Sequence, residues 1–507
     1  MKKVITDYLD ETANKYGRKN IFIENENNKI SYRAFVNESK KIATKIIKDY
    51  EYFNQPIAVF IDKSIDTLKA MSGSLYSGNF YTILDTESPK NRIDLIIDTL
   101  KPKLILTNSK NIEKIRGCNY DIELLNIDLI EEKVDKKLIK QVNSKMISTN
   151  PAYILFTSGS TGVPKGTVIS HKALITYAIW FKETFDINEK TVFGNQTPFY
   201  FSMSVSDIYS TVLSGATFCI IPKINFSFPV NLIKYLNNYK VNTIYWVPSA
   251  LSIVANLDTF NYILPSTLEK VLFAGEVMPT PALNKWIKYL PNIMYANLFG
   301  PTETTDICTY YIVNRKFKDS ESLPIGKPCN NCDILIINEE GKEAEIGEVG
   351  ELYVRGDFLG NGYYNNSEKT DDAFVQNPVN KAYPEKVYRT GDLGKYNKYG
   401  EIEYFGRKDF QIKHMGYRIE LGEIETNINA IKDLTICACI YDNDNKQIVL
   451  FYEAPKLTDD DIVKYVNNKL LNYMRPNKII KLSKMPFNAN GKIDRVKLKN
   501  DYKEMDK

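Results

Sequence analysis

The segment Thr157–Gly166 contains the residue types that hold a phosphate group. Its ten residues include four hydroxyl side chains, three glycines and one lysine, Lys165. Glycines let backbone N–H groups approach an anion, and the lysine supplies positive charge. The spacing is not that of a Walker loop, so a GTPase-type fold is not predicted. The segment predicts a phosphate-binding loop, with a polar surface loop as the alternative from composition alone.

Further blocks follow this loop along the chain. In order, they are Phe299–Thr304, Gly350–Leu352 with Gly362–Tyr363, Tyr388–Leu393, Gly406–Lys413 with Gly416–Glu420, and Asn490–Ile493. This ordered set covers nearly the whole chain and resembles the adenylate-forming superfamily, which includes acyl-CoA synthetases, luciferases and adenylation domains of nonribosomal peptide synthetases. Phe410–Lys413 and Gly416–Leu421 most resemble amino-acid adenylation domains, especially stand-alone D-alanine:carrier protein ligases.

The resemblance implies an ATP-dependent acid–thiol ligase that forms AMP. Such an enzyme joins a small carboxylic acid, here expected to be an amino acid, to AMP and releases pyrophosphate. It then passes the acyl group to the phosphopantetheine thiol of a carrier protein. The chain ends soon after Lys492 with no carrier domain, so a carrier in trans is expected. An acyl-CoA synthetase or an aryl- or hydroxy-acid ligase stays open, as does a binding module without turnover.

The resemblance also assigns nucleotide-binding residues. Attack of a carboxylate on the α-phosphate brings two anions together, so the site must supply positive charge and hydrogen-bond donors. Thr302 is expected to contact the α-phosphate, and Glu303 to bind Mg²⁺ through carboxylate oxygen. Asp392 is expected at the ribose hydroxyls and Arg418 at the phosphate or ribose. The remaining expected residues are Thr157, Ser158, Gly159, Ser160, Thr161, Gly162 and Lys165 at the β- and γ-phosphates, and Gly275, Asn297 and Phe299 at the adenine.

Two residues are expected to connect adenylation with thiol transfer. Lys492 resembles the family lysine that reaches between the substrate carboxylate and AMP, where a compact point charge is needed. Asp409 matches the hinge from which the C-terminal domain rotates, so that two half-reactions share one pocket. The expected catalytic residues are therefore Lys492, Thr302, Glu303, Arg418 and Asp409.

The expected acid pocket departs from that of α-amino-acid adenylating enzymes. Those enzymes usually carry an aspartate at the position of Ser202, and a hydroxyl cannot neutralise an ammonium taken out of water. Asp306 is a candidate to hold an amine displaced from the α-carbon. Alternatively, Asp306 turns toward solvent and the pocket takes a hydroxy or aryl acid bonded by Ser202 or Tyr245. The expected pocket residues are Ser202, Met203, Ser206, Tyr245, Leu272, Ala274, Leu298, Asp306 and Ile307.

Apolar runs separated by helical patterns must position these residues. Pro56–Ile61, Leu104–Thr107 and Ala152–Phe156 are predicted strands, and a helical pattern begins near His171. This alternation predicts an α/β fold with parallel layers, in which ligand loops follow the strands. From about Ile325, short β-like segments such as Gly347–Val354 predict a small antiparallel or barrel-like layer.

The next break lies near Asp409. We expect a large N-terminal domain over 1–408 that binds ATP and the acid, and a small mobile α+β domain over 409–507 that carries the catalytic lysine. The elements predicted for the second domain are a helix from Glu423, strands at Thr435–Tyr441 and Gln447–Tyr452, and a helix near Asp459–Leu471.

Composition excludes several other classes. The 507 residues are 43% hydrophobic and 25% charged, as in packed proteins, and a net charge of +4 does not argue for nucleic acid. No signal-peptide core or membrane-spanning run is visible, so a cytoplasmic protein is expected. Cys329 and Cys332 have C-x-x-C spacing, but no second pair follows at zinc-site distance. The two histidines, His171 and His414, leave little basis for a His-dependent hydrolase.

Overall fold

The computed structural model describes residues 3–159, 163–408, 411–487 and 493–505. Its contacts divide the chain into two compact units. Unit 1 comprises Met1–Thr86, Thr99–Leu155 and Gly166–Lys408, and unit 2 comprises Glu87–Asp98, Phe156–Lys165 and Asp409–Lys507. The domain division into 1–408 and 409–507 stays a prediction, because two short segments of the first range group with unit 2.

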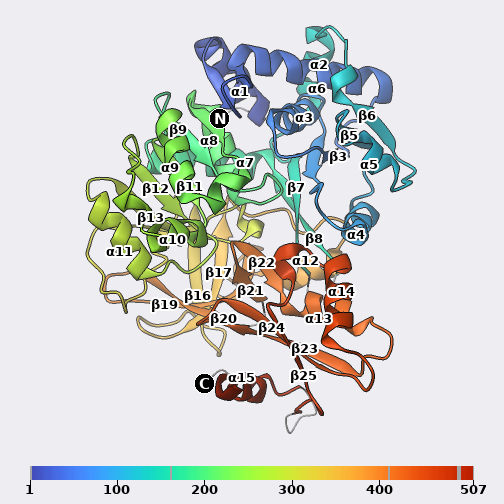
Figure 1. Ribbon diagram of the computed structural model, residues 1–507. Coiled ribbons are helices and arrows are strands. Elements are labelled where there is room, and N and C mark those ends of the chain that lie inside the picture. The colour runs from blue at the N-terminus through green and yellow to red at the C-terminus, as the bar shows by residue number, and fades with distance from the viewer. Residues whose placement is uncertain (1–2, 160–162, 409–410, 488–492, 506–507) are drawn as a thin grey trace. The chain divides into compact units, whose positions relative to one another are not determined.

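A nine-stranded sheet forms one layer of unit 1 (Figure 1). Its six central strands are parallel neighbours, and their short apolar sequences are buried, as in sheets covered by helices. The strand order is β15 (Lys327–Pro328), β14 (Thr309–Ile312), β13 (Met294–Phe299), β12 (Lys270–Phe273), β11 (Thr243–Trp246), β9 (Val192–Asn195), β10 (Thr217–Ile220), β1 (Asn20–Ile23) and β2 (Lys29–Ser31).

A second sheet of unit 1 has six strands and contains all three strands predicted from the apolar runs. Its order is β6 (Glu123–Asn126), β5 (Leu104–Thr107), β3 (Pro56–Phe60), β4 (Phe80–Ile83), β7 (Pro151–Thr157) and β8 (Lys165–Ser170). Four of its neighbouring pairs are parallel: β3–β4, β3–β5, β5–β6 and β4–β7. The prediction of an α/β fold with parallel layers is therefore confirmed.

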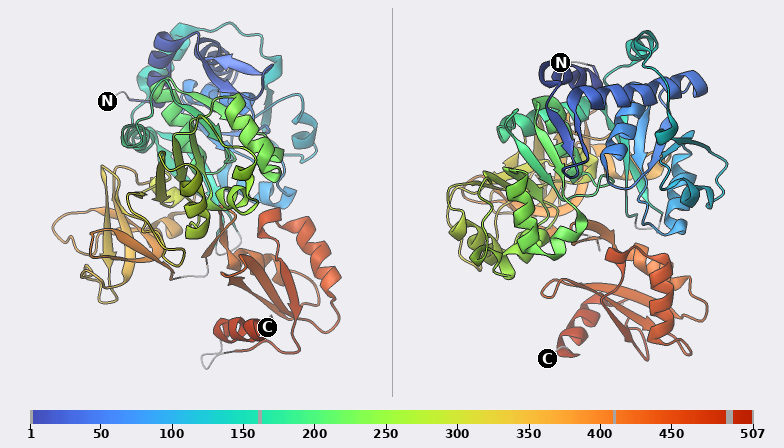
Figure 2. Two further views of the ribbon diagram at one scale, coloured as in Figure 1. Left: turned by 60° about the vertical axis from the view of Figure 1, so that its left-hand side comes forward. Right: turned by 45° about the horizontal axis from the view of Figure 1, so that its top comes forward.

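Helices cover these sheets and share one continuous core with them. At the N-terminal end α1 (Ile5–Tyr16), α2 (Tyr32–Tyr50) and α3 (Ile65–Tyr76) pack side by side (Figure 2). The predicted helix at His171 is α7 (His171–Thr184), whose N-terminus is capped by the Ser170 hydroxyl, and it packs against α8 (Met203–Ser214). The other helices of unit 1 are α5 (Ile112–Arg116), α6 (Lys136–Lys145), α9 (Pro229–Asn238), α10 (Pro248–Asn256), α11 (Thr280–Tyr289) and α12 (Ser367–Ala373), whereas most of α4 (Lys90–Leu100) belongs to unit 2.

The predicted antiparallel layer is a third, five-stranded sheet of unit 1. It consists of β16 (Cys332–Ile337), β17 (Gly350–Gly356), β18 (Phe374–Gln376), β19 (Lys386–Tyr396) and β20 (Ile402–Arg407). All of its pairings are antiparallel, as the turn-rich sequence predicts. Among the described residues no pairing closes this sheet into a barrel, so the layer is an open sheet.

Unit 2 contains a three-stranded sheet with helices on both faces. Residues of β23 (Ile436–Asp442) alternate: Cys437 and Cys439 pack with α13 (Leu421–Asn429) and α14 (Asp459–Lys469), whereas Ala438 and Ile440 pack with α15 (Arg495–Met505). The predicted helices and strands are present, but α15 was not predicted, because only Leu498 and Tyr502 of this charged helix are buried. The remaining strands are β24 (Gln447–Glu453), β25 (Lys478–Lys481), β21 (Gln411–His414) and β22 (Tyr417–Glu420).

In the part of the chain that the structure describes, no helix is long and apolar enough to cross a membrane. All seven cysteines are free thiols.

Candidate active site

Several expected pocket residues lie at the carboxyl ends of neighbouring parallel strands. Tyr245 on β11 is in register with Leu272 on β12, which is in register with Ala296 on β13. Leu298 follows Ala296 by two residues, and Ala274 follows Leu272 by two, so these side chains share one face of the sheet. All five residues are buried. The carboxyl edge is where α/β sheets bind ligands.

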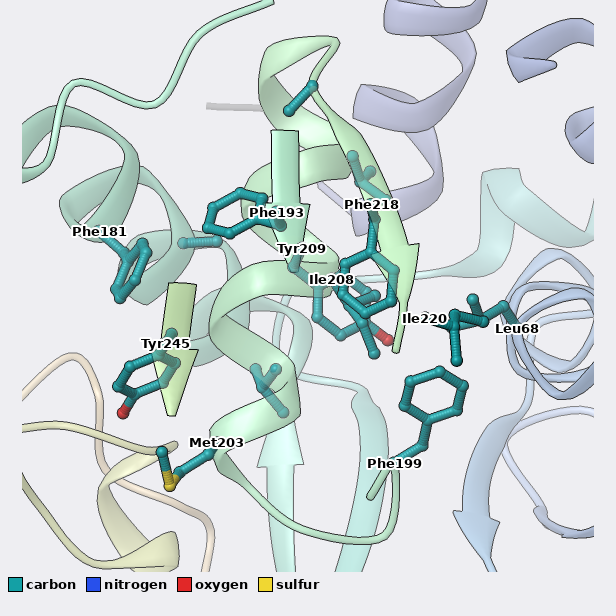
Figure 3. Packing of buried hydrophobic residues seen from close by; sticks show 14 of the residues in the cluster. Leu68, Phe181, Phe193, Phe199, Met203, Ile208, Tyr209, Phe218, Ile220 and Tyr245 are labelled. Atoms are coloured by element: carbon teal, nitrogen blue, oxygen red, sulfur yellow. The ribbon is translucent and has the colours of Figure 1, made fainter. Parts of the chain in front are cut away.

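Helix α8 supplies the next part of the site. Ser202 occupies the N-cap position, Met203 is the first helical residue, and Ser206 lies four residues after Ser202. Residues four apart are neighbours on one helix face, so both serines can face the same space. Figure 3 shows the Met203 side chain near the carboxyl end of β11, close to the Tyr245 ring. The helix and the strand thus converge on one end of the sheet.

The segment after β13 turns sharply before Asp306. Thr305 has φ 70° and ψ −57°, and the Asp306 N–H donates to the Thr304 carbonyl at 2.8 Å. This is a γ-turn with positive φ, a strained conformation for a β-branched residue. The Thr305 hydroxyl donates to the Phe358 carbonyl at 2.8 Å and helps to fix the turn. A Cβ atom at Gly300 would lie 2.4 Å from the Asp306 carbonyl oxygen, so only glycine fits there.

This turn places the Asp306 carboxylate inside the protein, with 2% of the residue exposed. Its Oδ2 accepts hydrogen bonds from the hydroxyls of Ser206 (2.6 Å), Tyr245 (3.1 Å) and Tyr177 (3.2 Å). Burial raises the pKa of Asp306 to about 6, and the hydroxyl donors partly oppose that rise. The alternative in which Asp306 turns toward solvent is therefore wrong. Ile307, which follows it, is also buried.

Thr302 and Glu303 lie beside this cluster. The Thr302 hydroxyl donates to the Ser202 hydroxyl oxygen at 3.3 Å, so the residue expected at the α-phosphate contacts the expected pocket directly. The Glu303 carboxylate is fully buried and accepts a hydrogen bond from the Tyr363 hydroxyl at 2.6 Å. The Gly360 N–H donates to the Glu303 carbonyl at 2.8 Å. Side chain and backbone of Glu303 are thus both held in place.

Asp392, the residue expected at the ribose, is buried in a polar cluster of the five-stranded sheet. Its Oδ2 accepts from the Arg407 guanidinium at 2.8 Å, and its Oδ1 accepts from the Tyr404 hydroxyl at 3.2 Å. The Tyr404 ring lies 5.6 Å from the ring of Phe299, the residue expected against the adenine. A carboxylate has about four acceptor positions, so further donors can reach Asp392.

The other two residues expected at the adenine follow neighbouring strands. The Asn297 side-chain amide donates to the Pro324 carbonyl at 2.9 Å. Gly275 has φ 91°, a conformation that favours glycine, and lies two residues beyond β12. Phe273 of β12 is paired with Asn297 of β13. Gly275 and Phe299 each come two residues after this pair, toward the carboxyl edge of the sheet.

The phosphate-loop residues belong to unit 2 from Phe156 onward. The Thr157 hydroxyl is buried and has no hydrogen-bond partner among the described residues, which suits a ligand oxygen. The Ser158 hydroxyl donates to the Arg418 carbonyl at 2.9 Å, so two expected site residues meet. Gly159 is described, and Lys165 is the first residue of β8. Ser160, Thr161, Gly162, Asp409 and Lys492 lie outside the described residues.

Four functional candidates were missed by sequence reasoning. Tyr177 lies in a helix of mostly apolar residues, and no local pattern indicates that its hydroxyl reaches Asp306, 129 residues later. Tyr363 and Arg407 stand in two of the family blocks and could have been found there. Tyr404 precedes such a block by two residues and gives no signal of its own.

The pattern of AMP-binding enzymes matches residues 9–364 of this sequence. The chain belongs to the AMP-binding enzyme family. This family membership confirms the predictions of the adenylate-forming superfamily and of an AMP-forming ligase.

Two of the curated relatives are synthases. Bacitracin synthase 1 of Bacillus licheniformis is 32% identical over 475 residues, which are 93% of this chain and 9% of that protein. Zwittermicin A synthase ZmaJ of Bacillus cereus is 30% identical over 476 residues, which are 92% of this chain and 89% of that protein. The chain therefore spans a small part of the first relative and most of the second.

Two solved structures share the fold. An NRPS protein with adenylation and PCP domains, holo-PA1221, has a TM-score of 0.82 at 20% identity, over 98% of this chain and 84% of that chain. The o-succinylbenzoate CoA synthetase (MenE) of Bacillus subtilis has a TM-score of 0.84 at 19% identity, over 97% of this chain and 98% of that chain. At these identities the likeness concerns the fold alone.

Proposed function

We propose that this protein uses ATP to adenylate a small carboxylic acid and then transfers the acyl group to the phosphopantetheine thiol of a carrier protein. The observation that carries the proposal is the contact between Thr302 and Ser202, because it joins the residue expected at the α-phosphate to the expected acid pocket. The buried Glu303 follows Thr302 directly, so an anionic ligand for a phosphate-bound cation lies beside the reacting groups.

In the first half-reaction a substrate carboxylate oxygen attacks the α-phosphorus of ATP. A new oxygen–phosphorus bond forms, the bond from that phosphorus to the bridging oxygen breaks, and pyrophosphate leaves. The Thr302 hydroxyl is placed to donate a hydrogen bond to the α-phosphate, where negative charge collects. Asp392 would hold the ribose. Thr302 and Asp392 would thus orient the nucleotide for attack.

Glu303 fits a role in holding Mg²⁺. Its carboxylate is buried, and the Tyr363 hydroxyl fixes one of its oxygens at 2.6 Å. The described residues contain no cluster of three or more acids, histidines or cysteines that could hold a metal ion by themselves. Mg²⁺ commonly takes one or two carboxylates together with substrate phosphates, and it would neutralise phosphate charge when bound. A single buried glutamate suits that arrangement.

In the second half-reaction the thiol sulfur attacks the acyl carbon of the adenylate. A carbon–sulfur bond forms, the bond from that carbon to the AMP oxygen breaks, and AMP leaves as the thiol loses its proton. The fold shared with an NRPS protein that contains adenylation and PCP domains supports a carrier-bound thiol. The fold shared with a CoA synthetase supports a second candidate function. In it the acceptor is free coenzyme A, and the acid is an aryl or hydroxy acid.

ATP–pyrophosphate exchange across a panel of α-, β- and ω-amino acids, hydroxy acids and aryl acids tests the first half-reaction. We expect strong exchange with at least one small acid. The loaded enzyme is then offered coenzyme A or a phosphopantetheinylated carrier, and thioester formation identifies the acceptor. No exchange with any acid would favour a binding module without turnover.

Lys492→Ala separates the two half-reactions. We expect this variant to lose nearly all adenylate formation and to keep most thioester formation from a supplied acyl-adenylate, because the lysine serves only the first step. Equal loss of both steps would contradict the role given to Lys492.

A further inference from the structure

The Asp306 carboxylate has an unusual set of neighbours for a buried charge. Three hydroxyls, from Ser206, Tyr245 and Tyr177, donate to one of its oxygens at 2.6–3.2 Å. Tyr177 and Tyr245 stay protonated, since burial and the charge of Asp306 hold the pKa of both phenols well above its usual range. The cluster is therefore a set of neutral donors around one acid.

None of the described residues places a positive charge on this acid. No lysine, arginine or histidine nitrogen lies within 4.0 Å of the Asp306 carboxylate in the described ranges. Hydroxyl donors orient and stabilise a carboxylate, but they leave its net charge uncompensated in a medium of low dielectric constant. Such a site is completed by a proton or by a cationic ligand.

The position of the cluster favours a ligand. Ser202 accepts a hydrogen bond from Thr302 at 3.3 Å, and hydrogen bonding by the Ser202 hydroxyl also lowers the pKa of Asp306. Ser202 thus contacts the residue expected at the α-phosphate and acts on the buried acid. Ser206, which donates to Asp306, lies four residues after Ser202 on α8, so the two serines can face the same side of the helix.

The other residues expected in the acid pocket cannot neutralise an ammonium. Ser202 offers a hydroxyl where α-amino-acid relatives are expected to carry an aspartate. The other expected wall residues are apolar and buried: Met203, Leu272, Ala274, Leu298 and Ile307. An amine on the α-carbon would lie in this apolar stretch, whereas an amine farther along the chain would reach the carboxylate.

We propose that Asp306 binds the ammonium group of the substrate and that the substrate is an acid whose amine is separated from the carboxyl group by two or more carbons. This inference rests on the proposed adenylation of an acid in the same pocket. Ser206, Tyr245 and Tyr177 position the Asp306 carboxylate, and the apolar wall contacts the methylene groups. The α-amine of an ordinary amino acid finds no partner of opposite charge.

Pyrophosphate exchange with four acids of one carbon skeleton tests this inference. The acids are butyrate and its α-, β- and γ-amino derivatives, and the proteins are the wild type, Asp306→Asn and Asp372→Asn. Asp372 is an exposed acid on α12 and controls for the chemical change itself. We expect the wild type to prefer the β- or γ-amine over butyrate, and Asp306→Asn to reduce that preference about a hundredfold, as loss of a buried charge pair does. Asp372→Asn should keep the wild-type preference.

A second variant tests the position of the amine. Ser202→Asp restores a carboxylate near the α-carbon and should raise the kcat/KM for α-aminobutyrate relative to the γ-amine. Preference of the wild type for butyrate or the α-amine, or an unchanged preference in Asp306→Asn, would overturn the inference and leave adenylation standing. If the wild type exchanges with no acid in this series or the wider panel, the proposed function fails instead.

Discussion

Two buried carboxylates lie at the first turns of α8, and they differ in the groups around them. Asp207 is part of the helix, and Asp306 accepts a hydrogen bond from Ser206 of the same helix. Asp207 accepts hydrogen bonds from the Asn195 amide (2.9 Å) and the Ile208 N–H (3.0 Å), and the charge of Lys63 favours its ionised form. Asp306 accepts hydrogen bonds from three hydroxyls. Neither acid has a cation within 4.0 Å among the described residues, so the charge of Lys63 acts on Asp207 from farther away. Burial raises the pKa of Asp207 to about 7 and that of Asp306 to about 6.

The residues that donate to Asp306 are neighbours of Asp207 and of its donor. Ser206, which donates to Asp306, is followed directly by Asp207 in the helix. Asn195, which donates to Asp207, is in register with Tyr245, which donates to Asp306. Burial alone therefore does not reveal a ligand site. We interpret Asp207, on which the charge of Lys63 acts, as a structural acid, and Asp306, whose donors are three hydroxyls, as an acid that a ligand completes.

Lys63 also ties the structural acid to the chain that leads into α8. Its ammonium donates to the Gln196 carbonyl at 3.0 Å and lies 5.5 Å from the centre of the Phe199 ring. Burial lowers the pKa of Lys63 to about 7, and the charge of Asp207 opposes that change. Asp207 and Lys63 thus hold the segment that ends at Ser202, the N-cap of α8.

The largest expected effect is on stability. Asp207→Asn removes the charge opposite Lys63, so we expect the free energy of unfolding to fall by about 3 kcal/mol. Asp306→Asn removes a buried charge that has no cationic partner, so we expect no loss, or a small gain. Midpoints of urea unfolding compare the two variants with the wild type. Equal losses in both would remove the distinction between the two acids.

The next effect is on stabilisation by the substrate. At a ligand concentration of about a hundred times Kd, a β- or γ-amino acid should stabilise the wild type by about 2.7 kcal/mol, seen as a higher Tm. Asp306→Asn should lose most of this shift. Asp207→Asn should start from a lower Tm and keep the shift. A shift that survives in Asp306→Asn would show that the ammonium binds elsewhere.

A third effect is on the pH dependence of KM. The raised pKa of Asp306, about 6, means that the empty site is protonated below pH 6 and must release a proton to bind an ammonium. KM for the amino acid should therefore rise by up to about tenfold per pH unit below pH 6. Tyr177 and Tyr245 face this acid and stay neutral, and Asp207 acts on Tyr245.

Asp306→Asn is the matched variant for this pH profile. Its KM should lack the rise below pH 6, whereas any contribution from Asp207 would persist. A profile that is the same in the wild type and Asp306→Asn would assign the titration to another group.

The smallest effect concerns the hydroxyl donors. Tyr245→Phe removes one hydrogen bond to the Asp306 carboxylate, so we expect KM for the amino acid to rise roughly tenfold, or about 1.4 kcal/mol. Tyr209→Phe is the control, because the Tyr209 hydroxyl is hydrogen-bonded to Tyr81 at 2.6 Å and not to Asp306. The control should change stability without changing KM, and a rise in both would show a general packing effect.

Much of the fold could be predicted because its signals are local. The strand Leu104–Thr107 has the predicted bounds, and Pro56–Ile61 differs by one residue from β3. Short apolar runs bounded by turn residues need no distant partner to be recognised. Helix α15 was missed for the converse reason, since its charged sequence shows few apolar positions and its two buried residues depend on the sheet beneath.

The sequence by itself determined the family and the pocket's most informative feature. The order of the blocks from Thr157 to Lys492 carries the adenylation chemistry, and Ser202 already excludes the usual anchor for an α-ammonium. The family and the missing anchor both follow from which residue type stands at which place in the order of the blocks, so neither requires coordinates.

Only the tertiary structure decided where Asp306 points and what surrounds it. Its three hydroxyl partners lie 61, 100 and 129 residues away in the sequence, on β11, α8 and α7. They meet because helices pack on the carboxyl edge of the sheet, and because a strained turn at Thr305 directs the next side chain inward. Residue types fix which groups can ionise, but burial and distant partners fix whether a carboxylate has its counter-charge inside the protein or must take it from a ligand.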